Sequence, residues 1–134
     1  MKLAIFACNN GLGHIRRSVI IAKYLSNSFE VHLFGDRKKL DKFKIPKKIR
    51  IINQDIKFEP TKNFIRNKYK FKKKLSKYKN KFDLIFTDTF PEAHFLGKKI
   101  YIFSNFLWHR EFKILSTKYL RLEKSLLRNK VIFF

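Results

Sequence analysis

The chain has 134 residues, which suits one domain with a real hydrophobic core and is short for an enzyme of two full domains. It carries 32 Lys and Arg against 10 Asp and Glu, and this formal net charge of +22 attracts polyanions such as nucleic acid, anionic lipid headgroups or phosphorylated substrates. The single Cys8 excludes an intramolecular disulfide and favours a reducing, cytoplasmic setting. The same Lys-, Ile-, Asn- and Phe-rich composition is typical of A/T-rich genes, in which many lysines are only solvated.

The first 26 residues predict a strand, a glycine loop and a helix. Residues 2–8 are short and nearly continuous in apolarity, as in a buried strand. The following loop ends at Gly13, and its two glycines allow positive φ or the close approach of a ligand to the backbone. From His14 to residue 26, small and apolar side chains recur at helical spacing. Free backbone N–H groups at the start of this helix favour a phosphate or a substrate that carries one.

The rest of the chain alternates between short apolar runs and helical patterns. Strands are predicted over 29–34, 48–52, 83–87, 99–104 and 130–134, helices over 61–81, 91–97 and 110–128, and a short helix or turn over 37–44. Such alternation indicates an α/β fold, a Rossmann-like parallel sheet with helices on both faces. We expect a single domain over 1–134, and no run reaches the about 20 apolar residues of a membrane span, which predicts a soluble or peripheral protein.

Ligands of such sheets bind at the carboxyl ends of the strands, where three groups of polar residues are predicted to meet. These candidates are the loop 9–14, with Asn10, Gly11, Leu12, Gly13 and His14 as its site residues, the strand-end Asp88, and the segment 104–109, with Asn105 and His109. The segment 104–109 can instead be a structural turn with a core Trp108. A metal site is disfavoured, because no histidine pair has ligand spacing and Cys8 has no second cysteine.

A dinucleotide site is the nearest alternative on physical grounds. Gly11 and Gly13 follow a strand and open a helix, and Asp36 stands where an acid could hold a ribose. The third glycine of the dinucleotide motif, however, is Arg16 here, whose bulk opposes close packing of helix and strand. Nicotinamide binding is therefore disfavoured.

A resemblance to known enzymes lies in the segment 10–18, NGLGHIRRS. It is similar to the first loop and helix of GT-B glycosyltransferases, in particular the UDP-sugar transferases and the bacterial peptidoglycan N-acetylglucosaminyltransferase, whose opening loop ends in Gly-His. The segment 83–90, DLIFTDTF, resembles the family segment in which a strand ends in Asp shortly before Phe. The resemblance implies that His14 is the general base for an acceptor hydroxyl and that Asp88 holds its other ring nitrogen. A helix-start residue without catalytic function is the alternative for His14.

The resemblance covers the acceptor half of the two-domain GT-B architecture, apparently without its last strands. It implies transfer of a sugar, with inversion, from a nucleotide sugar to a hydroxyl of a glycan or lipid-linked acceptor. The domain itself would need no cofactor, and the nucleotide-sugar donor is expected on a missing domain or on a partner subunit. A fragment, one subunit of a split enzyme and a degenerate binding domain remain open, and the chain alone is expected to be inactive.

The segment 57–81 contains eleven Lys or Arg residues and one acid, Glu59. Its aromatic and apolar residues recur at helical spacing and continue just beyond it: Phe64, Phe71, Leu75, Tyr78 and Phe82. We expect this stripe to pack on the sheet and the lysines to favour an anionic membrane surface, placing the protein in the cytoplasm or peripherally on the inner face of the membrane. Nucleic acid is disfavoured, since no RNA- or DNA-binding motif accompanies the charge. The alternative function is thus a non-catalytic basic module that docks on anionic membrane or nucleic acid.

Overall fold

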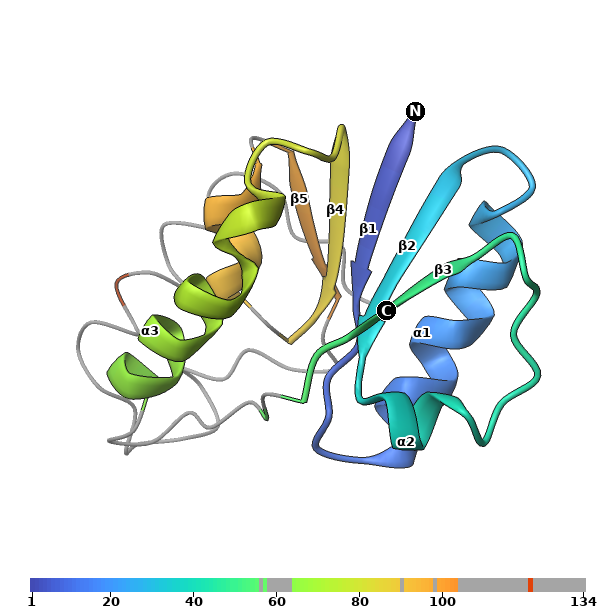
Figure 1. The fold of residues 1–134 in the computed structure, drawn as a ribbon, viewed down its shortest axis with the longest axis horizontal. Helices are drawn as coiled ribbons and strands as arrows, with labels where there is room; N and C mark the ends of the chain where they lie inside the picture. Colours follow the sequence, from blue (N-terminus) through green and yellow to red (C-terminus); the bar gives the residue numbers. More distant parts are fainter. Residues whose placement is uncertain (56, 58–63, 90, 98, 104–120, 122–134) are drawn as a thin grey trace.

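The computed structural model, shown in Figure 1, describes residues 1–55, 57, 64–89, 91–97, 99–103 and 121. Its elements are, in chain order, β1 (Lys2–Phe6), α1 (Leu12–Leu25), β2 (Glu30–Gly35), α2 (Arg37–Leu40), β3 (Arg50–Asn53), α3 (Phe64–Leu75), the 3-10 helix η1 (Ser76–Tyr78), β4 (Leu84–Asp88), the 3-10 helix η2 (Pro91–Leu96) and β5 (Ile100–Phe103). The helix predicted over 110–128 and the strand predicted over 130–134 lie outside the described residues.

The described strands form one parallel sheet in the order β3-β2-β1-β4-β5. The chain thus builds outward from β1 through β2 to β3, and then returns to the other side of β1 to add β4 and β5. This is a Rossmann-like α/β arrangement, as the sequence predicts. Loops that follow β1 and β4 leave the sheet in different directions, so the carboxyl ends of these two strands frame a ligand crevice in folds of this kind.

Side chains of β1 alternate between two hydrophobic cores, one on each face of the sheet. Leu3, Ile5 and Ala7 belong to a cluster that includes residues of α1 and α2. Ala4 and Phe6 belong to a second cluster that includes residues of α3 and η2. Figure 1 shows α1 and α2 on one side of the sheet and α3 on the other. Alternate side chains of β1 therefore pack in cores on opposite faces of the sheet, and helices cover both faces, as predicted.

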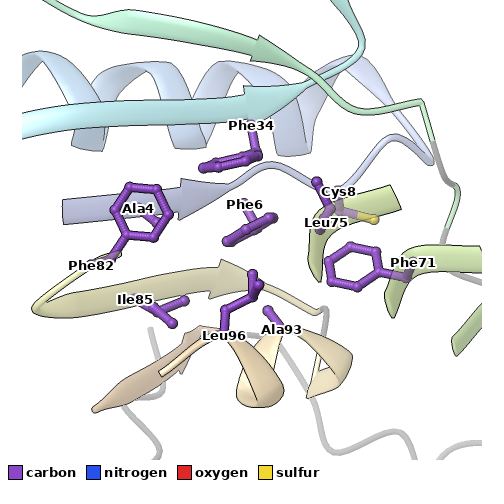
Figure 2. Close-up of a cluster of buried hydrophobic side chains, with 10 residues drawn as sticks. All are labelled: Ala4, Phe6, Cys8, Phe34, Phe71, Leu75, Phe82, Ile85, Ala93 and Leu96. Carbon is purple, nitrogen blue, oxygen red and sulfur yellow. The ribbon is translucent and has the colours of Figure 1, made fainter. Parts of the chain in front are cut away.

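Aromatic packing dominates the core beneath α3 (Figure 2). The ring of Phe6 stacks on Phe34 of β2, with the ring centroids 4.2 Å apart, and lies 5.7 Å from the ring of Phe71. Phe71 and Leu75 of α3 are each 1% exposed. Phe71, Leu75 and Tyr78 of the predicted stripe therefore pack on the sheet, and the side chain of Phe64 lies outside the described residues. Lys70, Lys72, Lys73 and Lys74 are left at the surface.

Several predicted elements are longer than those observed. The helix predicted over 61–81 changes to 3-10 geometry at Ser76, and the helix of the segment 37–44 ends at Leu40. Apolar periodicity marks which side chains face the sheet, and it does not fix where backbone hydrogen bonding stops. None of the described helices is long and apolar enough to cross a membrane.

Replacing Phe6 tests the core directly. Phe6 is fully buried between aromatic rings, so the Phe6→Ala variant should lose about 3–5 kcal/mol of the free energy of unfolding. Tyr24, 78% exposed on α1, provides the control, and Tyr24→Ala should change stability by no more than about 0.5 kcal/mol. Urea denaturation followed by circular dichroism measures both. Equal losses in the two variants would contradict the packing described here.

Candidate functional site

The candidate site lies at the carboxyl ends of β1 and β4, where the strand order reverses. Asp88 is the last residue of β4 and is fully buried. His14 is the third residue of α1, the helix that follows β1, and its side chain is 33% exposed. Parallel strands end at one edge of the sheet, so two residues separated by 74 positions in the sequence meet here.

The imidazole of His14 contacts the carboxylate of Asp88 through Nδ1. The distance from Nδ1 is 3.1 Å to Oδ1 and 3.1 Å to Oδ2. An ionised carboxylate only accepts hydrogen bonds, so this contact is a bond when Nδ1 carries the proton. The other ring nitrogen, Nε2, is then left with a lone pair in the neutral imidazole. Such an arrangement orients the ring and can accept a proton from a substrate hydroxyl.

Arg17, one helical turn beyond His14, binds the same carboxylate. Its Nη2 donates to Oδ1 of Asp88 at 2.6 Å, and its Nε donates to Oδ2 at 3.2 Å. Its guanidinium carbon also lies 5.5 Å from the centre of the Phe103 ring. A bidentate arginine compensates the charge of a buried carboxylate and fixes its orientation. Two side chains of a single helix, His14 and Arg17, therefore hold the carboxylate of Asp88.

The guanidinium of Arg17 and the imidazole of His14 also lie close to each other at Asp88. Nη2 of Arg17 lies 3.2 Å from Nδ1 of His14. A guanidinium has no acceptor, so either Nδ1 carries a proton that goes to Asp88, or Nδ1 is bare and accepts from Arg17. The charge-assisted bond to the carboxylate is the stronger of the two, which favours the proton on Nδ1. Arg17 is not among the site residues predicted from the sequence, although its i,i+3 spacing from His14 places both on one helix face.

The backbone just after Asp88 is strained. Thr89 has φ of 61°, a left-handed conformation that β-branched residues rarely adopt. Its hydroxyl donates to the carbonyl of Asp88 at 2.7 Å, and its N–H donates to the carbonyl of Phe103 at 3.3 Å. A threonine in this conformation costs about 1–3 kcal/mol and persists only where its surroundings enforce it.

The glycine loop contributes backbone to this edge, and its geometry differs from one expectation. Neither of its glycines has positive φ: Gly11 is the extended N-cap of α1, which begins at Leu12 rather than at His14. Asn10 is exposed, and Leu12 is 47% exposed. A Cβ placed on Gly13 would meet no atom within 4 Å, so the fold itself does not require glycine there. Gly13 instead leaves the start of the helix open to approach.

Asn9, the first residue of the predicted ligand loop, joins the loops after β1, β2 and β3. Its Oδ1 accepts from the N–H of Asp36 at 3.0 Å, and its Nδ2 donates to the carbonyl of Gln54 at 2.5 Å. Its own carbonyl accepts from Nζ of Lys39. Asp36, the candidate ribose ligand, uses Oδ1 to accept from the N–H of Lys38 as the N-cap of α2. The polar groups of Asn9 and Asp36 are therefore used in hydrogen bonds that hold the loops after β1, β2 and β3 together.

Two of the predicted site residues, Asn105 and His109, lie outside the described residues. Within the described part of the chain, no group of three or more His, Cys, Asp or Glu side chains could hold a metal ion. No protein-family model matches the chain, and no curated protein sequence matches it. Function is therefore inferred from the residues and their geometry.

Adjacent arginines on α1 test the arrangement around Asp88. Arg17→Met leaves a buried carboxylate with His14 as its remaining ring donor, so the variant should lose about 3 kcal/mol of the free energy of unfolding. Arg16 is exposed, and Arg16→Met should change stability by no more than about 0.5 kcal/mol. Adding Asp88→Asn to Arg17→Met removes the buried charge and should restore part of the loss. Urea denaturation of all three variants measures the coupling, and equal stability of the two single variants would refute it.

Proposed function

We propose that this domain binds the acceptor in a glycosyltransferase reaction and activates its hydroxyl. The observation that carries the proposal is the contact between the part-exposed imidazole of His14 and the buried carboxylate of Asp88 at the switch point of the sheet. The resemblance of the segment 10–18 to GT-B enzymes supports the same assignment. The acceptor is a glycan or a lipid-linked saccharide that offers a free hydroxyl.

In the proposed reaction, Nε2 of His14 takes the proton of the acceptor hydroxyl. The oxygen attacks the anomeric carbon of the donor sugar, and the bond to the nucleoside diphosphate breaks as the new glycosidic bond forms. A single base suffices for this displacement, which inverts the anomeric centre. The donor is held outside the described sheet, on a further domain or on a partner subunit.

Asp88 orients the ring and stabilises the imidazolium that forms. Arg17 weakens the stabilisation of the imidazolium, because its guanidinium already compensates the charge of the same carboxylate at 2.6 Å. The carboxylate therefore serves as the acceptor for Nδ1–H. In this scheme Arg17 is a positioning residue, and His14 is the group that touches the substrate.

Substitution of His14 tests the proposal. The chain is first screened on an array of glycans and lipid-linked saccharides, and the retained acceptor is then incubated with radiolabelled nucleotide sugars, with and without a donor-binding partner. Loss of the base in His14→Ala should lower transfer by about 10²–10⁴-fold and leave acceptor retention nearly unchanged. Asp88→Asn should lower transfer less, because the base itself remains.

Arg16→Ala, an exposed change in the same helical turn, is the matched control and should retain transfer. Circular dichroism establishes that each variant is folded. Full transfer by His14→Ala would reject His14 as the base, and retention of no saccharide at all would reject an acceptor domain. Retention of configuration in the product would reject direct displacement.

A second candidate function is electrostatic docking on an anionic membrane, and it is favoured by the surface of α3. The helix packs Phe71 and Leu75 into the core, so these two side chains are not available to a bilayer. The side chains described at its surface are Tyr69 and four lysines: Lys70, Lys72, Lys73 and Lys74. Attraction by these lysines alone is sensitive to salt.

Vesicle sedimentation tests this second function. The chain should sediment with vesicles that contain phosphatidylglycerol and not with pure phosphatidylcholine vesicles. Binding should be lost as salt rises from about 0.1 M to 1 M, since the screening length falls from about 10 Å to about 3 Å. The variant Lys70→Gln/Lys72→Gln/Lys73→Gln should bind more weakly than Lys23→Gln/Lys38→Gln/Lys42→Gln, which removes the same charge elsewhere. Equal weakening would assign the attraction to net charge instead of α3.

A further inference from the structure

A pocket of about 390 Å³ lies at the amino-terminal edge of the sheet, opposite the edge that holds His14 and Asp88. Three of its lining residues, Lys2, Glu30 and Arg50, are the first residues of β1, β2 and β3. The pocket therefore gathers charged groups that are far apart in the sequence. Nothing in the proposed transfer reaction uses them.

The register of the strands places these groups on one face. Lys2 pairs with Glu30 across β1 and β2, and His32 pairs with Arg50 across β2 and β3. Side chains two apart on a strand share a face, so Glu30 and His32 point to the same side of the sheet. Phe34, the next residue on that face of β2, lies in the core beneath α3. The charged groups thus border that core at its amino-terminal end.

His32 and Glu30, which both line the pocket, contact each other. The side chain of His32 is 9% exposed, and its Nε2 lies 2.9 Å from Oε1 of Glu30. Its Nδ1 is buried and has no hydrogen-bond partner among the described residues, so the ring is best satisfied with its proton on Nε2, donated to Glu30. This hydrogen bond, aided by the charges of Lys2 and Arg50, lowers the pKa of Glu30 below its ordinary value. Glu30 thus already occupies the pocket as an ionised anion.

Positive charge around the pocket exceeds what Glu30 can compensate. Lys2, Arg50 and Lys81 all line it, and within the described ranges no carboxylate lies within ion-pair distance of their side chains. One carboxylate therefore faces three cations among the described lining residues. A concave site with excess positive charge concentrates small anions.

Apolar side chains supply the walls. The ring of Phe82 meets His32 edge to face at 5.2 Å, and the ring of Tyr78 lies 6.3 Å from that of Phe82. Ile52 of β3 lines the same pocket. The lining therefore combines charged groups with aromatic and aliphatic side chains, and the volume is within the usual range of sites for small organic molecules.

We propose that this pocket binds a small phosphomonoester, with the phosphate among Lys2, Arg50 and Lys81 and the organic part against Tyr78 and Phe82. The ring of a sugar or an aromatic group matches the volume of about 390 Å³. Arginine and lysine together suit a phosphate, because the guanidinium fork and the ammonium both donate to its oxygens. The site is distinct from that of His14, so it stands or falls independently of the proposed transfer.

Phenyl phosphate is the probe. Inorganic phosphate, which carries the charge and lacks the organic part, is the comparison ligand. Each is titrated at constant ionic strength into the isotope-labelled full chain, and the ring signals of the histidines are followed by NMR. The signals of His32 should shift, whether or not those of His14 do, and phenyl phosphate should bind more tightly than inorganic phosphate.

Arg50→Gln and Lys81→Gln should each weaken the binding of phenyl phosphate by about tenfold. Lys23→Gln, an exposed change on α1 beneath the opposite face, is the charge-matched control and should bind within about twofold of the unmodified chain. Equal weakening by Arg50→Gln and Lys23→Gln overturns the site in favour of general attraction to net charge. Equal affinity for the two phosphates overturns recognition of the organic part. Signal shifts confined to His14 would show that the anion binds at the opposite edge of the sheet, and they would overturn the proposal.

Discussion

Parallel pairing of β1 on both of its sides is the constraint on which the rest of the structure depends. Leu3 pairs with Val31 of β2 and with Leu84 of β4, so the chain must leave β1 in one direction and later return to its other side. That reversal brings the start of α1 beside the end of β4. Parallel pairing of β1 with β2 and of β2 with β3 aligns the first residues of these three strands at the far edge. Both candidate sites are consequences of this parallel pairing.

The elements themselves could be predicted because their apolar patterns are local. In β1, nearly continuous apolarity indicates burial on both faces, and in α3 the spacing of Phe71 and Leu75 identifies the side that packs on the sheet. Spatial order is different, since nothing local in residues 84–88 states that they pair with β1. Nor does the stripe that continues to Tyr78 reveal that regular α-helix stops at Leu75, because 3-10 turns can keep the same side chains on the sheet.

Proximity of His14 and Asp88 could be expected from two strand ends at one edge, and their catalytic roles remain proposals. Arg17 was missed because its effect depends on the depth at which Asp88 is buried, which no sequence pattern states. Asn9 and Asn10 are identical neighbours, yet Asn9 is buried and bonded to two loops while Asn10 is exposed. Such differences arise from tertiary contacts, and local sequence carries no signal for them.

At the strained turn of Thr89, selection for thermal stability and selection for the position of Asp88 favour different residues. Glycine adopts a φ of 61° without the steric penalty that threonine incurs, so a laboratory selection for heat resistance alone would favour Thr89→Gly. The same change removes the hydroxyl bonded to the carbonyl of Asp88 and restores freedom to the backbone that directs its carboxylate. A lineage kept only for its thermal stability would therefore lose this hydrogen bond, whereas a lineage kept for the proposed role of Asp88 would retain the less stable turn.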